Sequence, residues 1–141
     1  MDQSIRDKIQ ASIDILPNLT AFGVGLYSGG RGMTKSERER DLREGQAHLL
    51  SMESDFVKTC EWLESIEKRK TINPNHSSYG LKHLAEKSVG YITNGLFIAA
   101  AIHCGFKFKI RPGSPNATFN MSEKSLRKKE AECRLMGRYP V

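Results

Sequence analysis

The sequence predicts a mainly helical α+β protein with about five helices and one antiparallel β-hairpin near the C-terminus. Two observations lead to this prediction. Apolar residues recur at helical spacing over most of the chain, and they alternate strictly with polar residues only around positions 106–121. The chain has 141 residues, 38% of them hydrophobic, which suits a single domain with a modest core. We expect one domain over 1–141, with N-terminal helices in 1–70 and a helical pair, the hairpin and a basic terminal helix in 71–141.

The first 33 residues predict one helix followed by a loop. Ile5, Ile9 and Ile13 lie at helical spacing, so residues 3–16 read as an amphipathic helix that ends before Pro17. Residues 22–33 contain five glycines and predict a flexible, glycine-rich loop.

Residues 34–68 predict a long helix. Thr34 and Glu37 have the spacing of a capping box, in which each side chain accepts a hydrogen bond from the other residue's backbone N–H. The apolar residues then alternate at intervals of three and four, as in a coiled-coil seam: Leu42, Leu49, Met52, Phe56, Cys60, Leu63 and Ile66. One interpretation is a homodimer through the helix at about 35–68. The alternative is that Gly45 breaks the helix and the remainder packs on the core.

The second half predicts two helices after a turn at residues 73–75, Asn-Pro-Asn. The first runs over 79–88, with Lys82, His83, Glu86 and Lys87 facing outward, and Gly90 ends it. The second runs over 95–104 and is apolar on every side, so we expect it to be buried.

Residues 106–121 predict the hairpin, and Ser122 then caps a terminal helix over 123–136. In the first strand Phe106, Phe108 and Ile110 alternate with Lys107, Lys109 and Arg111. In the second, Ala117, Phe119 and Met121 alternate with Thr118 and Asn120. One face of the hairpin is therefore apolar and the other is polar and basic. Two helices followed by a hairpin is also the order of a winged helix-turn-helix, but the second helix lacks the polar side chains that read base edges, which argues against sequence-specific reading.

The positive charge is concentrated at the C-terminus. The net charge is +6, and residues 106–141 hold nine basic residues against three acidic ones. Such clustering indicates an anionic partner, either nucleic acid or an acidic protein surface, although a solvated basic face would give the same pattern. The candidate binding residues are Lys107, Lys109, Arg111, Lys124, Arg127, Lys128, Lys129 and, in the glycine-rich loop, Arg31.

Catalytic and metal signatures are weak. The glycine-rich loop does not have the Lys-Ser/Thr ending of a P-loop. His76, His83, His103 and Cys104 do not have zinc-site spacing. We therefore expect no catalytic residue, no metal and no cofactor. The alternative is a small enzyme that uses Tyr79, His83 and Glu86, which share one helix face.

Cysteine content and hydropathy bear on location. The three cysteines are far apart and odd in number, which indicates a reducing compartment and no disulfide framework. The longest apolar run, 96–102, is far shorter than the ~20 residues of a membrane helix. These features predict a cytoplasmic protein that does not enter the membrane.

Three stretches of the second half carry a resemblance. They are Asn75–Glu86 (NHSSYGLKHLAE), Tyr91–Phe106 (YITNGLFIAAAIHCGF) and Asn116–Ser122 (NATFNMS). Together they resemble small accessory proteins of bacterial phages, plasmids and integrative elements. The resemblance covers only the second half and carries over no catalytic residue. It implies a bacterial host cell and a role in maintaining the element or in blocking a host defence such as a CRISPR–Cas complex.

The leading expectation is thus a non-enzymatic binding protein of a mobile element. Its most concrete form is an anti-CRISPR-type inhibitor that occupies a surface of a host defence nucleoprotein complex. Many such inhibitors are acidic DNA mimics, and this basic chain departs from that pattern. The alternative expectation is a nonspecific DNA- or RNA-binding accessory protein.

Overall fold

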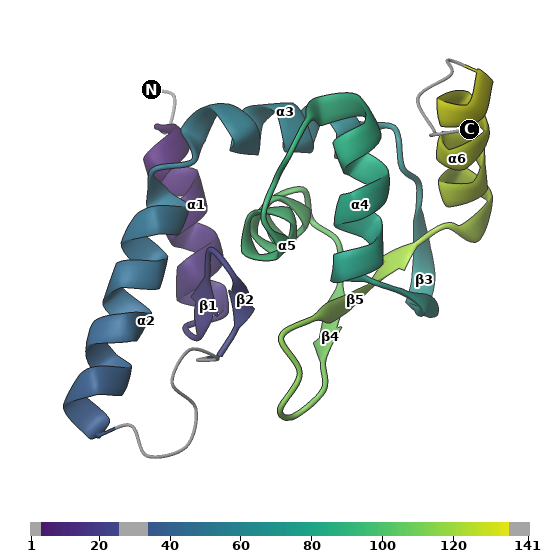
Figure 1. Cartoon of the computed structure of the whole chain (residues 1–141). Coiled ribbons are helices and arrows are strands. Elements are labelled where there is room, and N and C mark those ends of the chain that lie inside the picture. Colours follow the sequence, from purple (N-terminus) through teal and green to yellow (C-terminus); the bar gives the residue numbers. More distant parts are fainter. Residues whose placement is uncertain (1–3, 26–33, 136–141) are drawn as a thin grey trace.

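The computed structural model describes residues 4–25 and 34–135, which form helices around two small sheets (Figure 1). The elements are α1 (Ile5–Ile15), β1 (Leu19–Thr20), β2 (Gly23–Val24), α2 (Lys35–Leu50), α3 (Glu53–Glu64), β3 (Lys68–Ser77), α4 (Ser78–Val89), α5 (Asn94–His103), β4 (Phe108–Ile110), β5 (Ala117–Met121) and α6 (Glu123–Leu135). The predicted mainly helical α+β class is confirmed. The prediction of a single hairpin is wrong, because β1 and β2 pair with each other and β3 adds a third strand to the C-terminal sheet.

The apolar helix α5 is the centre of the core. Its residues from Asn94 to Ile102 are all buried, and α1, α3 and α4 pack against it (Figure 1). The Thr93 hydroxyl accepts a hydrogen bond from the N–H of Leu96 and caps the helix. The predicted burial of this helix is confirmed, and both halves of the chain contribute to the same core.

Two glycines allow the β1–β2 ribbon to lie between helices. A Cβ atom on Gly95 would lie 1.7 Å from the Thr20 carbonyl oxygen, and one on Gly45 would lie 2.8 Å from the Thr20 Cβ. Both distances are shorter than van der Waals contact, so only glycine permits this approach of α5 and α2 to the ribbon.

The predicted continuous helix over 34–68 is wrong. The capping box of Thr34 and Glu37 is present, but α2 ends at Leu50 and α3 begins at Glu53, where the chain turns across the top of α5 (Figure 1). Gly45 lies inside α2, so the alternative break there is wrong too. The turn places Leu49 and Phe56 in the core of the same chain, each at most 1% exposed. The homodimer through 35–68 stays a prediction, and these two seam residues are already buried within the chain.

The C-terminal sheet has the strand order β3-β5-β4, antiparallel throughout. The predicted turn at 73–75 is wrong, because these residues lie within β3. The pairing of β3 with β5 shifts register on both sides of Asn73, and within residues 4–25 and 34–135 no strand pairs with the other edge of β3. An irregular edge strand tolerates Pro74, which has no N–H to donate.

The last helix is anchored to β3 through Glu123. Its Oε1 accepts a hydrogen bond from Asn73 Nδ2 at 3.0 Å and lies 2.8 Å from His76 Nε2. Leu126 and Cys133 form the buried edge of α6, and the predicted last residue of this helix, 136, lies outside the described residues. Helices α1, α4 and α6 match their predicted ranges within one or two residues at each end where they are described. In the ranges 4–25 and 34–135, none of the helices is long and apolar enough to cross a membrane.

Candidate nucleic-acid interface

The predicted alternation is confirmed for β4 and for Ala117–Phe119, whereas Asn120, which was predicted on the polar face, is buried. Lys109 lies opposite Thr118 on the outer face of the sheet, and Phe108 lies opposite Phe119 on the inner face. Phe119 is only 1% exposed, while Lys109 and Arg111 are exposed. Burial of the apolar face in the core therefore turns the basic side chains of β4 to the outside.

Asn120 joins the two outer strands across β5. This side chain is 3% exposed. Its Oδ1 accepts a hydrogen bond from the Lys107 N–H at 2.7 Å, and its Nδ2 donates to the Arg69 carbonyl at 2.8 Å. The Lys107 ammonium reaches further and donates to the Lys70 carbonyl at 3.4 Å. The start of β4 is thus tied to the start of β3.

This arrangement adds basic residues that the sequence analysis missed. Lys68, Arg69 and Lys70 are all exposed and open strand β3. The Lys68 Nζ lies over the Phe106 ring, 4.8 Å from its centroid, so this side chain is directed toward the ring and is not counted with the other basic residues. The backbone of Arg69 and Lys70 is bonded to this edge of the sheet, through the Arg69 carbonyl to Asn120 and through the Lys70 carbonyl to the Lys107 ammonium. We call Arg69, Lys70, Lys107, Lys109 and Arg111 the basic sheet face. The local signal for this strand was weak: Thr71 and Ile72 are β-branched residues that favour strands, whereas lysine does not.

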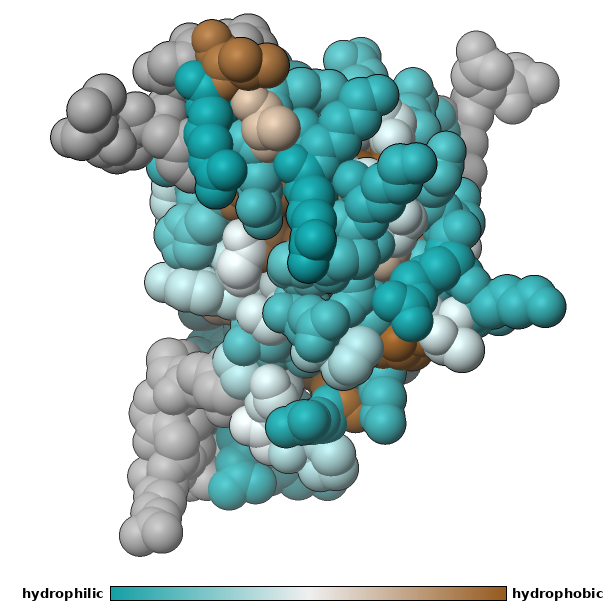
Figure 2. Space-filling view, turned by 90° about the vertical axis from the view of Figure 1, so that its right-hand side faces the viewer, coloured by the Kyte–Doolittle hydropathy of each residue, from teal (hydrophilic) through white to brown (hydrophobic). Residues whose placement is uncertain are grey.

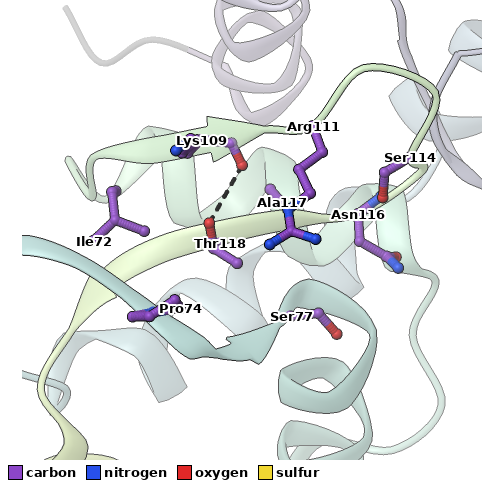
Figure 3. A pocket seen from close by; sticks show the side chains of 9 residues that line it. All are labelled: Ile72, Pro74, Ser77, Lys109, Arg111, Ser114, Asn116, Ala117 and Thr118. Carbon is purple, nitrogen blue, oxygen red and sulfur yellow. Dashed lines mark hydrogen bonds between the residues drawn. The ribbon is translucent and has the colours of Figure 1, made fainter.

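A shallow groove of about 380 Å³ runs along this face (Figure 3). Arg111 extends from β4 toward β5 in that view. Polar groups in the groove come from the side chains of Ser77, Ser114, Asn116 and Thr118, together with Lys109. The described lining residues include no acidic side chain. Cations with hydroxyl and amide donors beside them are the usual groups that contact phosphate oxygens.

The turn between β4 and β5 is held in place by hydrogen bonds from neighbouring elements. The Pro115 carbonyl accepts from the Val24 N–H at 3.0 Å and from Asn94 Nδ2 at 3.2 Å. The Ala117 N–H donates to the Ser78 hydroxyl at 3.0 Å. The groove therefore rests on backbone that is fixed by β2, α4 and α5.

The predicted basic residues of α6 do not join this face. Helix α6 stands beyond β3, well away from the β4–β5 turn (Figure 1). Lys124 and Lys128 are exposed there, and the side of the molecule that carries α6 is largely hydrophilic (Figure 2). Arg127 pairs with Glu123 at 3.4 Å. Lys129 lies over the Trp62 ring at 5.4 Å with its side chain 16% exposed. Arg31 lies outside the described residues.

Tyr79, His83 and Glu86 do lie together on α4, as predicted. The Tyr79 and His83 rings meet edge to face at 4.5 Å, and His83 Nδ1 lies 2.9 Å from a Glu86 oxygen. The same carboxylate also accepts hydrogen bonds from the Lys82 ammonium and the Ile92 N–H, so it is already held by the fold. Lys82 was predicted to face outward and is instead buried, at 7% exposed. The enzyme hypothesis stays untested.

The potential metal ligands are dispersed. His76 lies against Glu123, and His103 packs on the Phe56 ring at 5.4 Å. Over 4–25 and 34–135, no three or more His, Cys, Asp or Glu side chains come together in a group that could hold a metal ion.

Comparison of the chain with protein-family models, with curated proteins and with solved structures gives no match.

Proposed function

We propose that this protein is a non-enzymatic binding protein whose basic sheet face docks on the phosphate backbone of nucleic acid. The observation that supports this most strongly is the joining of β3 and β4 on either side of β5. It brings basic residues of both outer strands into one sheet, and two of them, Lys109 and Arg111, line a groove that also carries hydroxyl and amide groups. A groove of this composition matches phosphate oxygens better than it matches an apolar or cationic ligand.

The two cations that line the groove, Lys109 and Arg111, are available to bind an anion. No ion pair among the described residues involves Lys109 or Arg111. The Arg111 guanidinium has the planar donor geometry that binds two oxygens of one phosphate. This favours a phosphate ligand over a merely solvated face, because solvated charges need no fixed polar groove beside them.

Backbone contacts of this kind carry no sequence information. The most apolar helix, α5, is buried and reads no bases. Binding is therefore expected to be nonspecific in sequence and to weaken steeply with salt, because counterions leave the nucleic acid when the protein binds.

The more specific form of the proposal comes from the resemblance to accessory proteins of mobile elements. On that view the protein acts in the bacterial cytoplasm and occupies the exposed guide RNA or DNA of a host defence complex such as CRISPR–Cas. A positively charged face suits this target, since nucleic acid is the most strongly anionic part of such an assembly.

The test is binding of fluorescein-labelled 20-base-pair DNA and RNA, followed by anisotropy at several salt concentrations. Three to five phosphate contacts predict that the logarithm of the affinity falls with the logarithm of salt with a slope of roughly −3 to −4.5. Absence of binding at low salt would overturn the proposal. A pull-down from host lysate, with and without nuclease, tests the more specific form of the proposal, in which the target is the nucleic acid of a defence complex. Capture of a defence complex that is lost after nuclease treatment supports it, and capture that resists nuclease contradicts it.

A further inference from the structure

A second groove lies on the other side of the β4–β5 turn, with a volume of about 590 Å³. It is lined by the aromatic rings of Phe22, Tyr79 and Tyr91, and by Lys82, Asn94 and Asn116. The three rings are unusually exposed for their size, at 64%, 54% and 76% respectively. Exposed apolar groups gathered around one groove mark a binding site more often than a solvated surface.

The ammonium group of the buried Lys82 lies over two of these rings. The Lys82 ammonium lies 5.5 Å from the centroid of Tyr79 and 5.2 Å from that of Tyr91. Glu86 pairs with the same ammonium at 3.4 Å and offsets its charge. The groove therefore offers two positioned aromatic rings rather than a net charge.

We call this second groove the aromatic groove and the groove along the basic sheet face the phosphate groove. The two grooves adjoin each other. Asn116 lines both, and Ser77 of the phosphate groove is two residues before Tyr79. Asn94 also lines the aromatic groove. Its Nδ2 is bonded to Pro115 and Asn116, whereas its buried Oδ1 has no hydrogen-bond partner among the described residues.

We propose that Tyr79 and Tyr91 stack on unpaired bases of a single-stranded nucleic acid whose phosphates lie on the basic sheet face. This inference rests on the proposed function and adds its preferred substrate, a single strand. Stacking on aromatic rings tolerates any base, since every base has a π-face. Paired bases inside a duplex are not available for such stacking.

The test compares the full chain with the double variant Tyr79→Ala/Tyr91→Ala on a labelled 12-nucleotide single-stranded DNA and on the corresponding duplex. The expected result is at least a roughly tenfold loss of affinity for the single strand and no change for the duplex. The matched control is Tyr79→Phe/Tyr91→Phe, which keeps both rings and is expected to bind as the unmodified chain does. Circular dichroism and thermal melting verify that both variants fold.

The outcomes separate the two proposals. If the unmodified chain binds neither DNA, the proposed function and this inference both fail. If it binds both DNAs and the Ala variant binds the single strand equally well, only the stacking inference fails. If the Ala variant loses affinity equally for the single strand and the duplex, the stacking inference also fails. The substitutions would then have disturbed the basic sheet face rather than removed contacts with unpaired bases. A strand containing 5-iodouracil adds a direct readout: photocross-links to Tyr79 or Tyr91 support stacking, and cross-links confined to other residues contradict it.

Discussion

The Nζ of Lys107 donates a hydrogen bond to the carbonyl oxygen of Lys70 at 3.4 Å, across the intervening strand β5. Two basic segments that are far apart in the sequence thereby become one surface. The buried side chain of Asn120 lies beneath this contact and bonds both outer strands. The basic sheet face therefore depends on a polar group in the sheet as well as on the cations themselves.

Asn120→Ala should destabilise the fold and weaken nucleic-acid binding together. The change leaves the Lys107 N–H and the Arg69 carbonyl without their partner, at an expected cost of about 1–3 kcal/mol. Chemical denaturation measures the free energy of unfolding. The exposed Asn75 offers a control, because Asn75→Ala on the neighbouring strand β3 should cost far less. Equal costs for the two variants would show that Asn120 does not join the strands.

Gly95→Ala should destabilise the protein, whereas Gly80→Ala should stabilise it. A methyl group at 95 would meet the Thr20 carbonyl at 1.7 Å, so the helix or the ribbon must shift, at about 1–3 kcal/mol or more. Gly80 lies in α4 with open space around it, its closest neighbour being Ser77 Oγ at 3.9 Å, and alanine there should add about 0.5–1 kcal/mol. Thermal melting of both variants tests this. A neutral Gly95→Ala would disprove the close packing of α5 on the ribbon.

The stability of the protein should depend on the charge of Glu123 at acid pH. Hydrogen bonds, first from Asn73 and then from His76 and Arg127, lower the pKa of Glu123 below its ordinary value of 4.5. A carboxylate with a lowered folded pKa stabilises the fold above the ordinary pKa, and this contribution disappears as the pH falls from 4.5 through the folded value. The stability difference between the unmodified chain and Glu123→Gln should therefore be present at pH 6 and shrink below pH 4.5. Glu130→Gln controls for the loss of one carboxylate on the same helix. A difference that stays constant with pH would contradict the Glu123 contacts.

Cys104 should react with alkylating reagents before Cys60. The Cys104 Sγ lies 3.9 Å from the Cys60 carbonyl, and both side chains are partly buried. A hydrogen bond from the Cys60 thiol, helped by the charge of Lys68, lowers the pKa of Cys104, while the hydrogen bond to Cys104 and burial raise the pKa of Cys60. The reactive thiolate therefore forms first on Cys104 as the pH rises. Iodoacetamide labelling followed by peptide mass spectrometry measures the order. Preferential labelling of Cys60 would be the contrary result.

The features that could be predicted are those encoded by neighbouring residues. The capping box at Thr34, the buried apolar helix and the alternation of Lys109 with Phe108 each depend on a few adjacent positions. The ends of α2 and α3 could not be predicted, because no glycine or proline lies between Leu50 and Glu53 and the bend is imposed by the core. Strand β3 was missed because Pro74 and its neighbouring asparagines are typical of a turn, whereas their strand pairing is made with residues more than forty positions away.

The residues of the candidate site, too, could be predicted only where a local sequence pattern indicates them. The alternation of the hairpin was enough to predict Lys107, Lys109 and Arg111 on one face. Arg69 and Lys70 join them only through the long-range pairing of β3, so no local pattern could place them there. The contact of Lys129 with the Trp62 ring likewise joins two elements that are distant in the sequence, so no local pattern predicts it.

The most direct test compares two charge reversals of equal size, Lys109→Glu/Arg111→Glu on the sheet and Lys124→Glu/Lys128→Glu on α6. All four side chains are exposed, and each pair changes the net charge by the same amount. Anisotropy with labelled DNA at low salt should show at least a roughly tenfold loss for the sheet variant and a much smaller loss for the α6 variant. Equal losses would mean that total charge rather than the basic sheet face governs binding, and unchanged binding by the sheet variant would contradict the account outright.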